Sequence, residues 1–255
     1  MHRTADRFGI ATTDGVFRGG QSDSRSVNLV TSPFTDRSKG TDMKKLLTAA
    51  GLSLAATPAL AHHPLNGMPM ETFAHGLMSG VGHPLLGFDH LFFVVAMGIA
   101  ATFTAARHLT PAAYIAAMLA GCGLMYAGLA LPLAETLIVV SLLVIGGVVL
   151  SGRALGTGTA IALFATFGLF HGSAFGGAIA GQEGGASAAV LMGYLIGLGA
   201  VQYLVALASG RAIRALGASD AMAMNARLAG AMVAGVGVFL ALEIVEGPLV
   251  AAIAG

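Results

Sequence analysis

The sequence predicts an all-α membrane protein, a polytopic bundle of six transmembrane helices that follow a cleavable signal peptide. Of its 255 residues, 56% are hydrophobic and only 10% are charged, whereas a soluble domain is usually about 25% charged. The apolar residues come in runs of roughly 18 or more, the length that crosses about 30 Å of hydrocarbon. The cationic residues form no patch of the kind that binds nucleic acid, so we expect the lipid bilayer and not nucleic acid as a partner.

The first sixty residues divide into two parts. Residues 1–42 are polar and lack periodicity, which predicts disorder. Residues 43–61 combine two lysines, a short apolar run and the cleavage motif Ala59-Leu60-Ala61, as a secretory signal peptide does. A signal peptide begins a chain, so we expect Met43 to be the initiator and residues 1–42 to lie upstream of the true start. An uncleaved first membrane helix is the alternative.

Cleavage after Ala61 would leave His62 and His63 at the mature N-terminus, outside the cytoplasm. A free amine beside two imidazoles can bind Ni²⁺ or Cu²⁺, and a plain polar terminus is the alternative. We expect residues 62–82 to form a periplasmic N-terminal segment. Its apolar part, residues 66–82, is too short to span and is predicted to be periplasmic or partly re-entrant.

The predicted membrane domain, residues 83–250, contains six apolar segments. They cover residues 84–104, 112–130, 133–151, 158–178, 187–208 and 226–246. A mature N-terminus outside the cytoplasm places the loops near 105–111, 152–157 and 209–225 inside. The arginines of this part lie in or beside those loops, in agreement with the preference of Lys and Arg for the cytoplasmic side: Arg107, Arg153, Arg211, Arg214 and Arg227. The predicted location is the bacterial inner membrane, and the arginines indicate that the mature N-terminus lies outside the cytoplasm.

The opposite, outer side carries carboxylates and imidazoles, which would attract cations and repel anions. Its acidic residues are Glu71, Glu135, Glu183, Glu243 and Glu246, and its histidines are His62, His63, His75 and His83.

Ionisable residues inside membrane helices are functional candidates by default. Asp89 and His90 lie in the first span, and His171 lies in the fourth. At 1.5 Å per residue, His90 is about 9–10 Å below the outer surface and His171 is at roughly the same depth. We therefore expect one site between two helices, with both imidazoles as cation ligands and the carboxylate offsetting charge or orienting a ring. A hydrogen bond between Asp89 and His171 is the structural alternative.

Further candidates flank this site. His83, four residues before Gly87 and seven before His90, would share a helix face with both. The glycine-rich stretch after His171 predicts a broken or loosely packed helix whose carbonyls could line a cavity. Glu183 closes this stretch and is either a ligand or a solvated loop carboxylate. The remaining candidates, for which an ordinary structural role stays open, are His62, His63, His75 and Gln202.

The stretch "HPLLGFDH" (His83 to His90) fits an H-x5-D-H pattern that resembles the HupE/UreJ family of nickel and cobalt permeases. "FHGSAFGGAIAGQE", which ends at Glu183, resembles the second signature of that family in its cyanobacterial-type variant, as does the downstream "YLIGLGAVQY". The resemblance covers about residues 43–250. It implies the metal ligands His83, Asp89, His90, His171 and Glu183.

The resemblance implies a secondary permease that moves Ni²⁺ or Co²⁺ into the cytoplasm for nickel enzymes such as hydrogenase. Such a protein is not an enzyme and holds no tightly bound cofactor. No nucleotide-binding loop occurs in the chain. An intramembrane zinc-dependent hydrolase is the alternative, because histidines and an acid on several helices can also hold Zn²⁺ and a reactive water. A homo-oligomer is compatible with either function.

Overall fold

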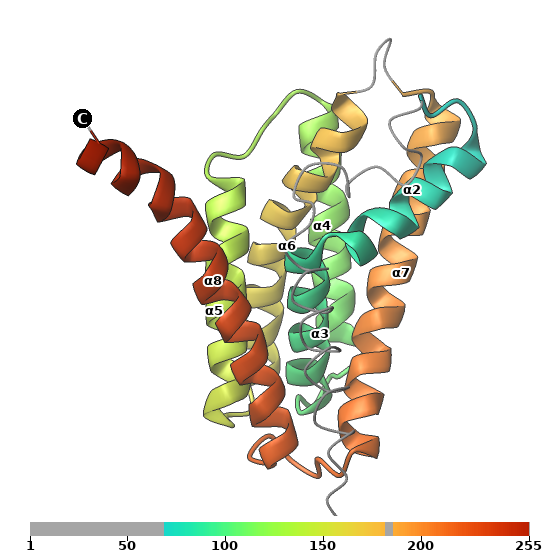
Figure 1. The fold of residues 1–255 in the computed structure, drawn as a ribbon. Helices are drawn as coiled ribbons and strands as arrows, with labels where there is room; N and C mark the ends of the chain where they lie inside the picture. Colours follow the sequence, from blue (N-terminus) through green and yellow to red (C-terminus); the bar gives the residue numbers. More distant parts are fainter. Residues whose placement is uncertain (1–68, 182–185, 255) are drawn as a thin grey trace, which may run out of the picture. The chain divides into compact units, whose positions relative to one another are not determined.

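The computed structural model describes residues 69–181 and 186–254, and in this part the protein is entirely helical (Figure 1). The signal peptide, His62, His63 and Glu183 lie outside these residues. The helices are α2 (Phe73–Leu86), α3 (Phe88–Thr102), α4 (Leu109–Tyr126), α5 (Ala134–Ser151), α6 (Thr157–Ala180), α7 (Ala188–Ala215) and α8 (Met224–Ala254).

The predicted class, a bundle of membrane-spanning helices, is confirmed, and the predicted six spans are reached only if the first one is a bent pair of helices. Helices α4 to α8 are each long and apolar enough to cross a membrane, and α2 with α3 passes the same test as a pair bent by 79°. The chain is therefore a multi-pass membrane protein, and its described residues contain five candidate spans, or six if the bent pair α2–α3 is one broken span and not a re-entrant loop. The segment that precedes the expected first span is the helix α2, and the expected boundary at residue 83 falls inside it.

The break lies at Gly87, between the two signature histidines. Pro84 lies in the last turn of α2, and Gly87 has extended dihedral angles that end α2 and begin α3. A β-carbon on Gly87 would lie 3.0 Å from the His90 ring, so glycine leaves room for that imidazole. The expectation that His83, Gly87 and His90 share one helix face is wrong, because His83 belongs to α2 and His90 to α3.

Small residues bring the helices together in pairs. A β-carbon on Gly76 of α2 would overlap the Val190 carbonyl of α7, and one on Gly193 would overlap the carbonyl of Phe73. Helices α5 and α8 meet in the same way, where Gly146 faces the backbone of Ala234. Because lipid tails are as apolar as the helices, close backbone contact is a main source of helix association in a membrane.

The expectation of a broken or loosely packed helix after His171 is wrong. Helix α6 continues without interruption to Ala180. Its glycines support close packing, because a β-carbon on Gly172 would overlap the Met118 carbonyl of α4, and one on Gly176 would lie 2.8 Å from the Cys122 carbonyl. The break that glycine and proline produce occurs in the first span instead.

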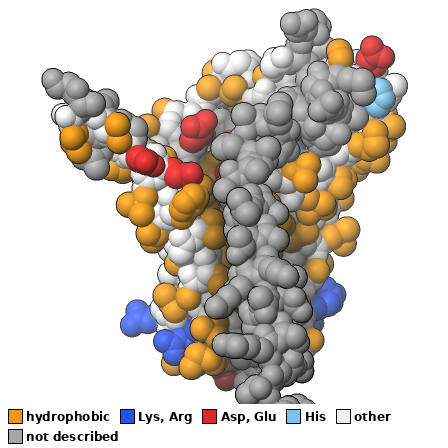
Figure 2. Space-filling model, viewed as in Figure 1, with side chains coloured by type: hydrophobic (Ala, Val, Ile, Leu, Met, Phe, Trp, Pro, Cys, Tyr) orange, Lys and Arg blue, Asp and Glu red, His pale blue; other side chains and the backbone are white. Residues whose placement is uncertain are grey.

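The arginines of the described residues share one end of the bundle. They lie in the α3–α4 and α5–α6 connections, in the last two turns of α7 and in the first turn of α8. Figure 2 shows Lys and Arg side chains near one end of the visible face and carboxylates toward the other. Asp220, between α7 and α8, is the exception among the acidic residues described.

Candidate metal site

An open cleft of about 550 Å³ connects the signature residues with two carboxylates from distant parts of the chain. Asp89 and His90 of α3 line it together with Glu135, in the first turn of α5, and Glu243 of α8. Its remaining lining residues are His83, Ile138, Val139, Ala174, Leu240 and Ile244. Three carboxylates and two imidazoles thus face one water-accessible space, which favours cations.

Asp89 holds the start of α3 and faces the cleft. Its Oδ1 accepts a hydrogen bond from the His90 backbone N–H at 2.8 Å, and its Oδ2 lies 3.9 Å from Nε2 of the His90 ring. The side chain of Asp89 is 33% exposed, so it remains open to the cleft. A carboxylate in the first turn also interacts favourably with the helix dipole.

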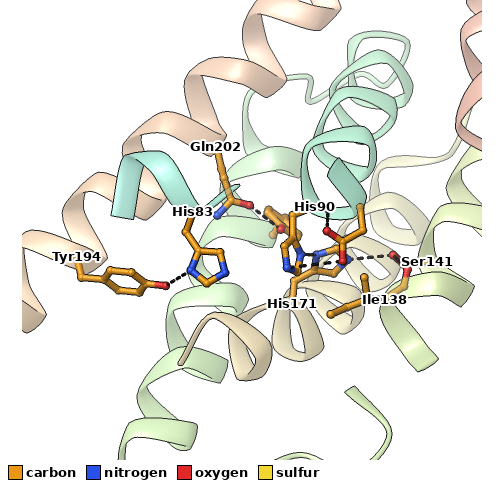
Figure 3. A network of polar contacts seen from close by, with 9 residues as sticks. His83, His90, Ile138, Ser141, His171, Tyr194 and Gln202 are labelled. Atoms are coloured by element: carbon orange, nitrogen blue, oxygen red, sulfur yellow. Dashed lines mark hydrogen bonds and ion pairs between the residues drawn. The ribbon is translucent and has the colours of Figure 1, made fainter. Parts of the chain in front are cut away.

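His90 and His171 meet as their depths predict. Their Nδ1 atoms lie 2.9 Å apart (Figure 3), and both rings are buried, that of His171 completely. The interhelical hydrogen bond weighed for Asp89 is therefore made by His90 instead. The far nitrogen of His171, Nε2, lies 3.0 Å from the hydroxyl of Ser141 on α5.

The hydroxyl of Ser141 determines which nitrogens carry protons. Its single proton is donated to the Ile138 carbonyl at 2.6 Å, so Ser141 can only accept from Nε2 of His171. In the neutral His171 ring, Nδ1 is then the acceptor, and His90 donates its Nδ1–H across the 2.9 Å contact. With its proton on Nδ1, a neutral His90 ring carries its one acceptor lone pair on Nε2, the nitrogen nearer to Asp89.

His83 takes the same tautomer by the same reasoning. The Tyr194 hydroxyl of α7 donates to the Phe175 carbonyl at 2.9 Å, so it accepts from Nδ1 of His83 at 3.3 Å. In the neutral ring the lone pair of His83 therefore lies on Nε2. Its ring centroid is 6.2 Å from that of His90, and Phe175 packs against both rings.

A second polar group lies next to His171. Tyr114 of α4 has its ring centroid 6.0 Å from that of His171 and donates its hydroxyl proton to Oε1 of Gln202 at 2.8 Å. The amide of Gln202 donates to the Leu198 carbonyl and lies 3.8 Å from the Met118 sulfur. All of these side chains are buried. Gln202 thus belongs to this second group, and its hydrogen bonds with described residues go to Tyr114, Leu198 and Met118 and not to the histidine pair.

Of the remaining candidates, His75 belongs to the described residues, and it does not line the cleft. His75 is in the first turn of α2, where its Nδ1 accepts from the Glu71 backbone N–H at 3.3 Å. Within residues 69–181 and 186–254, no three His, Cys, Asp or Glu side chains have the arrangement of a metal centre. The pair His90–His171 therefore stands as a partial ligand set, and its metal-binding role stays a prediction.

Sequence reasoning missed Ser141, Tyr194 and Tyr114, and it assigned Glu135 and Glu243 only to the outer side in general. Ser141 offered a signal, because a hydroxyl in the middle of the apolar run 134–151 must find a partner. The partner itself could not be read from the sequence.

Comparisons with known proteins agree with these signatures. Residues 50–240 match the family model described as "HupE / UreJ protein". The chain is 28% identical over 196 residues to Protein HupE of Rhizobium leguminosarum bv. viciae, and this match covers 74% of the chain and 100% of that relative. No solved structure matches the chain significantly.

Proposed function

This chain belongs to the HupE/UreJ family, and we propose that it is a secondary permease that carries Ni²⁺ or Co²⁺ across the bacterial inner membrane into the cytoplasm. The observation that carries the proposal is the buried imidazole pair beside a cleft lined by three carboxylates. Imidazole nitrogens suit these borderline metal ions, and a carboxylate offsets their charge.

In the proposed first step, the cleft collects the hydrated ion. Asp89, Glu135 and Glu243 give it a negative potential that raises the local concentration of cations. Nε2 of His90, with its lone pair and Asp89 beside it, is the first ligand we assign. His83 assists from α2, and Glu183 contributes from the α6–α7 connection.

In the proposed second step, the ion moves between His90 and His171. Two nitrogens that each lie about 2.0–2.1 Å from one ion are about 2.9 Å apart at a 90° angle and about 3.3 Å apart at the tetrahedral angle. The Nδ1 atoms are 2.9 Å apart, so a small separation or none brings both to ligand distance. When the ion takes its place between the rings, the proton on Nδ1 of His90 must pass, through water of the cleft, to Nε2 of the same ring, which the ion has left, so that His90 stays neutral.

The onward path we propose runs past Tyr114 and Gln202 toward the end that bears the arginines. Their oxygens and the Met118 sulfur offer weak ligands next to the pair. A weak and incomplete ligand set suits a permease, because a transported ion must be released. The membrane potential supplies about 4.6 kcal/mol for a divalent ion at 100 mV.

The test is uptake of labelled Ni²⁺ and Co²⁺ by cells that lack other carriers for these ions. We expect His90→Ala and His171→Ala each to reduce uptake at least tenfold at equal amounts of protein in the membrane. Ser151→Ala, at the far end of α5, serves as the control and should transport normally. Normal uptake by either histidine variant would refute the assigned site, and tightly held stoichiometric zinc in the purified protein would favour a hydrolase.

A further inference from the structure

Three of the five arginines in the described residues converge on one place. Arg107, Arg211 and Arg214 line a cavity of about 140 Å³ between the ends of α3 and α7. Arg107 and Arg214 also line an adjoining cavity of about 460 Å³ beside the α3–α4 connection. Thr102 and His108 belong to both linings, so the two cavities form one recess, which we call the arginine recess.

In the part of the chain that the structure describes, no carboxylate balances these three charges. None of the three guanidinium groups has an ion-pair partner among the described residues, and neither cavity has an acidic residue in its lining. Asp220, the acidic residue described at this end of the bundle, binds the Ser219 hydroxyl and the Met222 backbone N–H instead. Cationic groups gathered without a counter-charge repel one another unless an anion joins them.

The guanidinium groups of the three arginines also have N–H groups available to donate hydrogen bonds to a ligand. Nε and one Nη of Arg214 bind the hydroxyl and the carbonyl of Thr102 at 3.3 and 3.1 Å, and its guanidinium lies 5.7 Å from the centre of the Phe103 ring. Arg107 uses only Nε, on His108, and Arg211 uses one Nη on the Leu207 carbonyl. Since a guanidinium has five N–H donors, each arginine retains several for a ligand.

The walls of the recess have two kinds of surface. Gly98, Ala206 and Gly210 form a narrow inner wall, where α3 and α7 lie in contact. Leu207 and Leu109 give the outer parts an apolar surface, and the side chain of Leu109 is 57% exposed. An anionic head beside an apolar body, as in a phospholipid, would satisfy both surfaces.

We propose that the arginine recess binds a phosphate-bearing anion, the headgroup of an anionic phospholipid or a soluble phosphate compound. Planar guanidinium forks match phosphate oxygens in pairs. The general preference of arginine for the cytoplasmic side does not explain the recess. That preference accounts for arginines at this end of the bundle, but it does not require three of them to line the same cavity. Arg227, for example, lies at the same end outside the recess, where its Nε donates to the Leu150 carbonyl at 3.0 Å. The inference does not depend on metal transport.

The test compares thermal unfolding of the full chain in neutral detergent with added phosphatidylglycerol, phosphatidylcholine or inorganic phosphate. We expect phosphatidylglycerol to raise the unfolding temperature at concentrations where phosphatidylcholine has no effect. Arg107→Gln combined with Arg214→Gln should weaken the apparent affinity at least tenfold. Arg153→Gln combined with Arg227→Gln removes the same charge from the same end and should leave that affinity unchanged.

The three probes separate the possible outcomes. A response to inorganic phosphate equal to that of phosphatidylglycerol would assign a soluble ligand to the recess, and a response to the lipid alone would assign the headgroup. Equal losses in the two double variants would show a non-specific charge effect and overturn the proposal. So would the absence of any stabilisation by either phosphate probe. The single variant Arg107→Gln, in an exposed connection, provides the same comparison if the double variant does not fold.

Discussion

Ser141→Ala tests whether the second partner of His171 is part of the transport site. The change removes the hydroxyl that accepts from Nε2 of His171 at 3.0 Å and that donates to the Ile138 carbonyl at 2.6 Å. Ser141 is fully buried, so water does not replace the lost acceptor. The variant therefore leaves a buried imidazole N–H without a partner and frees the ring of His171 to adopt the other tautomer.

The loss of the hydrogen bond should affect both the stability of the protein and its affinity for the metal ion. An unsatisfied buried donor costs about 1–3 kcal/mol, so the variant should fold but unfold at a lower temperature. Loss of the hydrogen bond that orients a ligating histidine typically weakens metal binding about 10–100-fold. We therefore expect the KM for Ni²⁺ or Co²⁺ uptake to rise by about that factor, with a smaller change in maximal rate.

The assay is initial-rate uptake over a range of metal concentrations at matched protein levels. Ser151→Ala is the control, because Ser151 makes the same bond to the carbonyl three residues before it at 2.7 Å but is exposed and contacts no histidine. An unchanged KM in Ser141→Ala would refute the proposed role of the hydroxyl. A fall in maximal rate alone would also contradict it, because a role in orienting the ligand acts on affinity.

Two further sets of variants test helix packing and the cleft beside Asp89. Gly172→Ala should lower stability by about 1–3 kcal/mol, because the added methyl overlaps a carbonyl of α4, whereas Gly177→Ala has room and should be neutral, as measured by thermal unfolding in detergent. Glu135→Gln combined with Glu243→Gln should reduce uptake about tenfold at low ionic strength and less at high salt, because screening weakens steering. Glu246→Gln, outside the cleft lining, is the control, and a salt-independent loss would contradict the steering role.

The positions of His90 and His171 show which features of the site could be predicted from the sequence. Helix rise is a fixed property of the backbone, so counting residues from the span ends placed His90 and His171 at one level, and their nitrogens meet. The same counting failed at His83, because it assumed a continuous helix through Gly87. It also misjudged the glycines after His171, which allow close contact with α4 and leave α6 regular.

Membrane class, the apolar helices α4 to α8 and the clustering of arginines at one end followed from the sequence, because hydropathy, span length and charge are local properties of the chain. The partners of each side chain depended on the tertiary structure. A helix in lipid is apolar on all sides, so its sequence carries little information about its rotation toward a neighbour. Packing alone turned Ser141 toward His171, brought Glu135 and Glu243 to Asp89, and gathered three arginines into one recess.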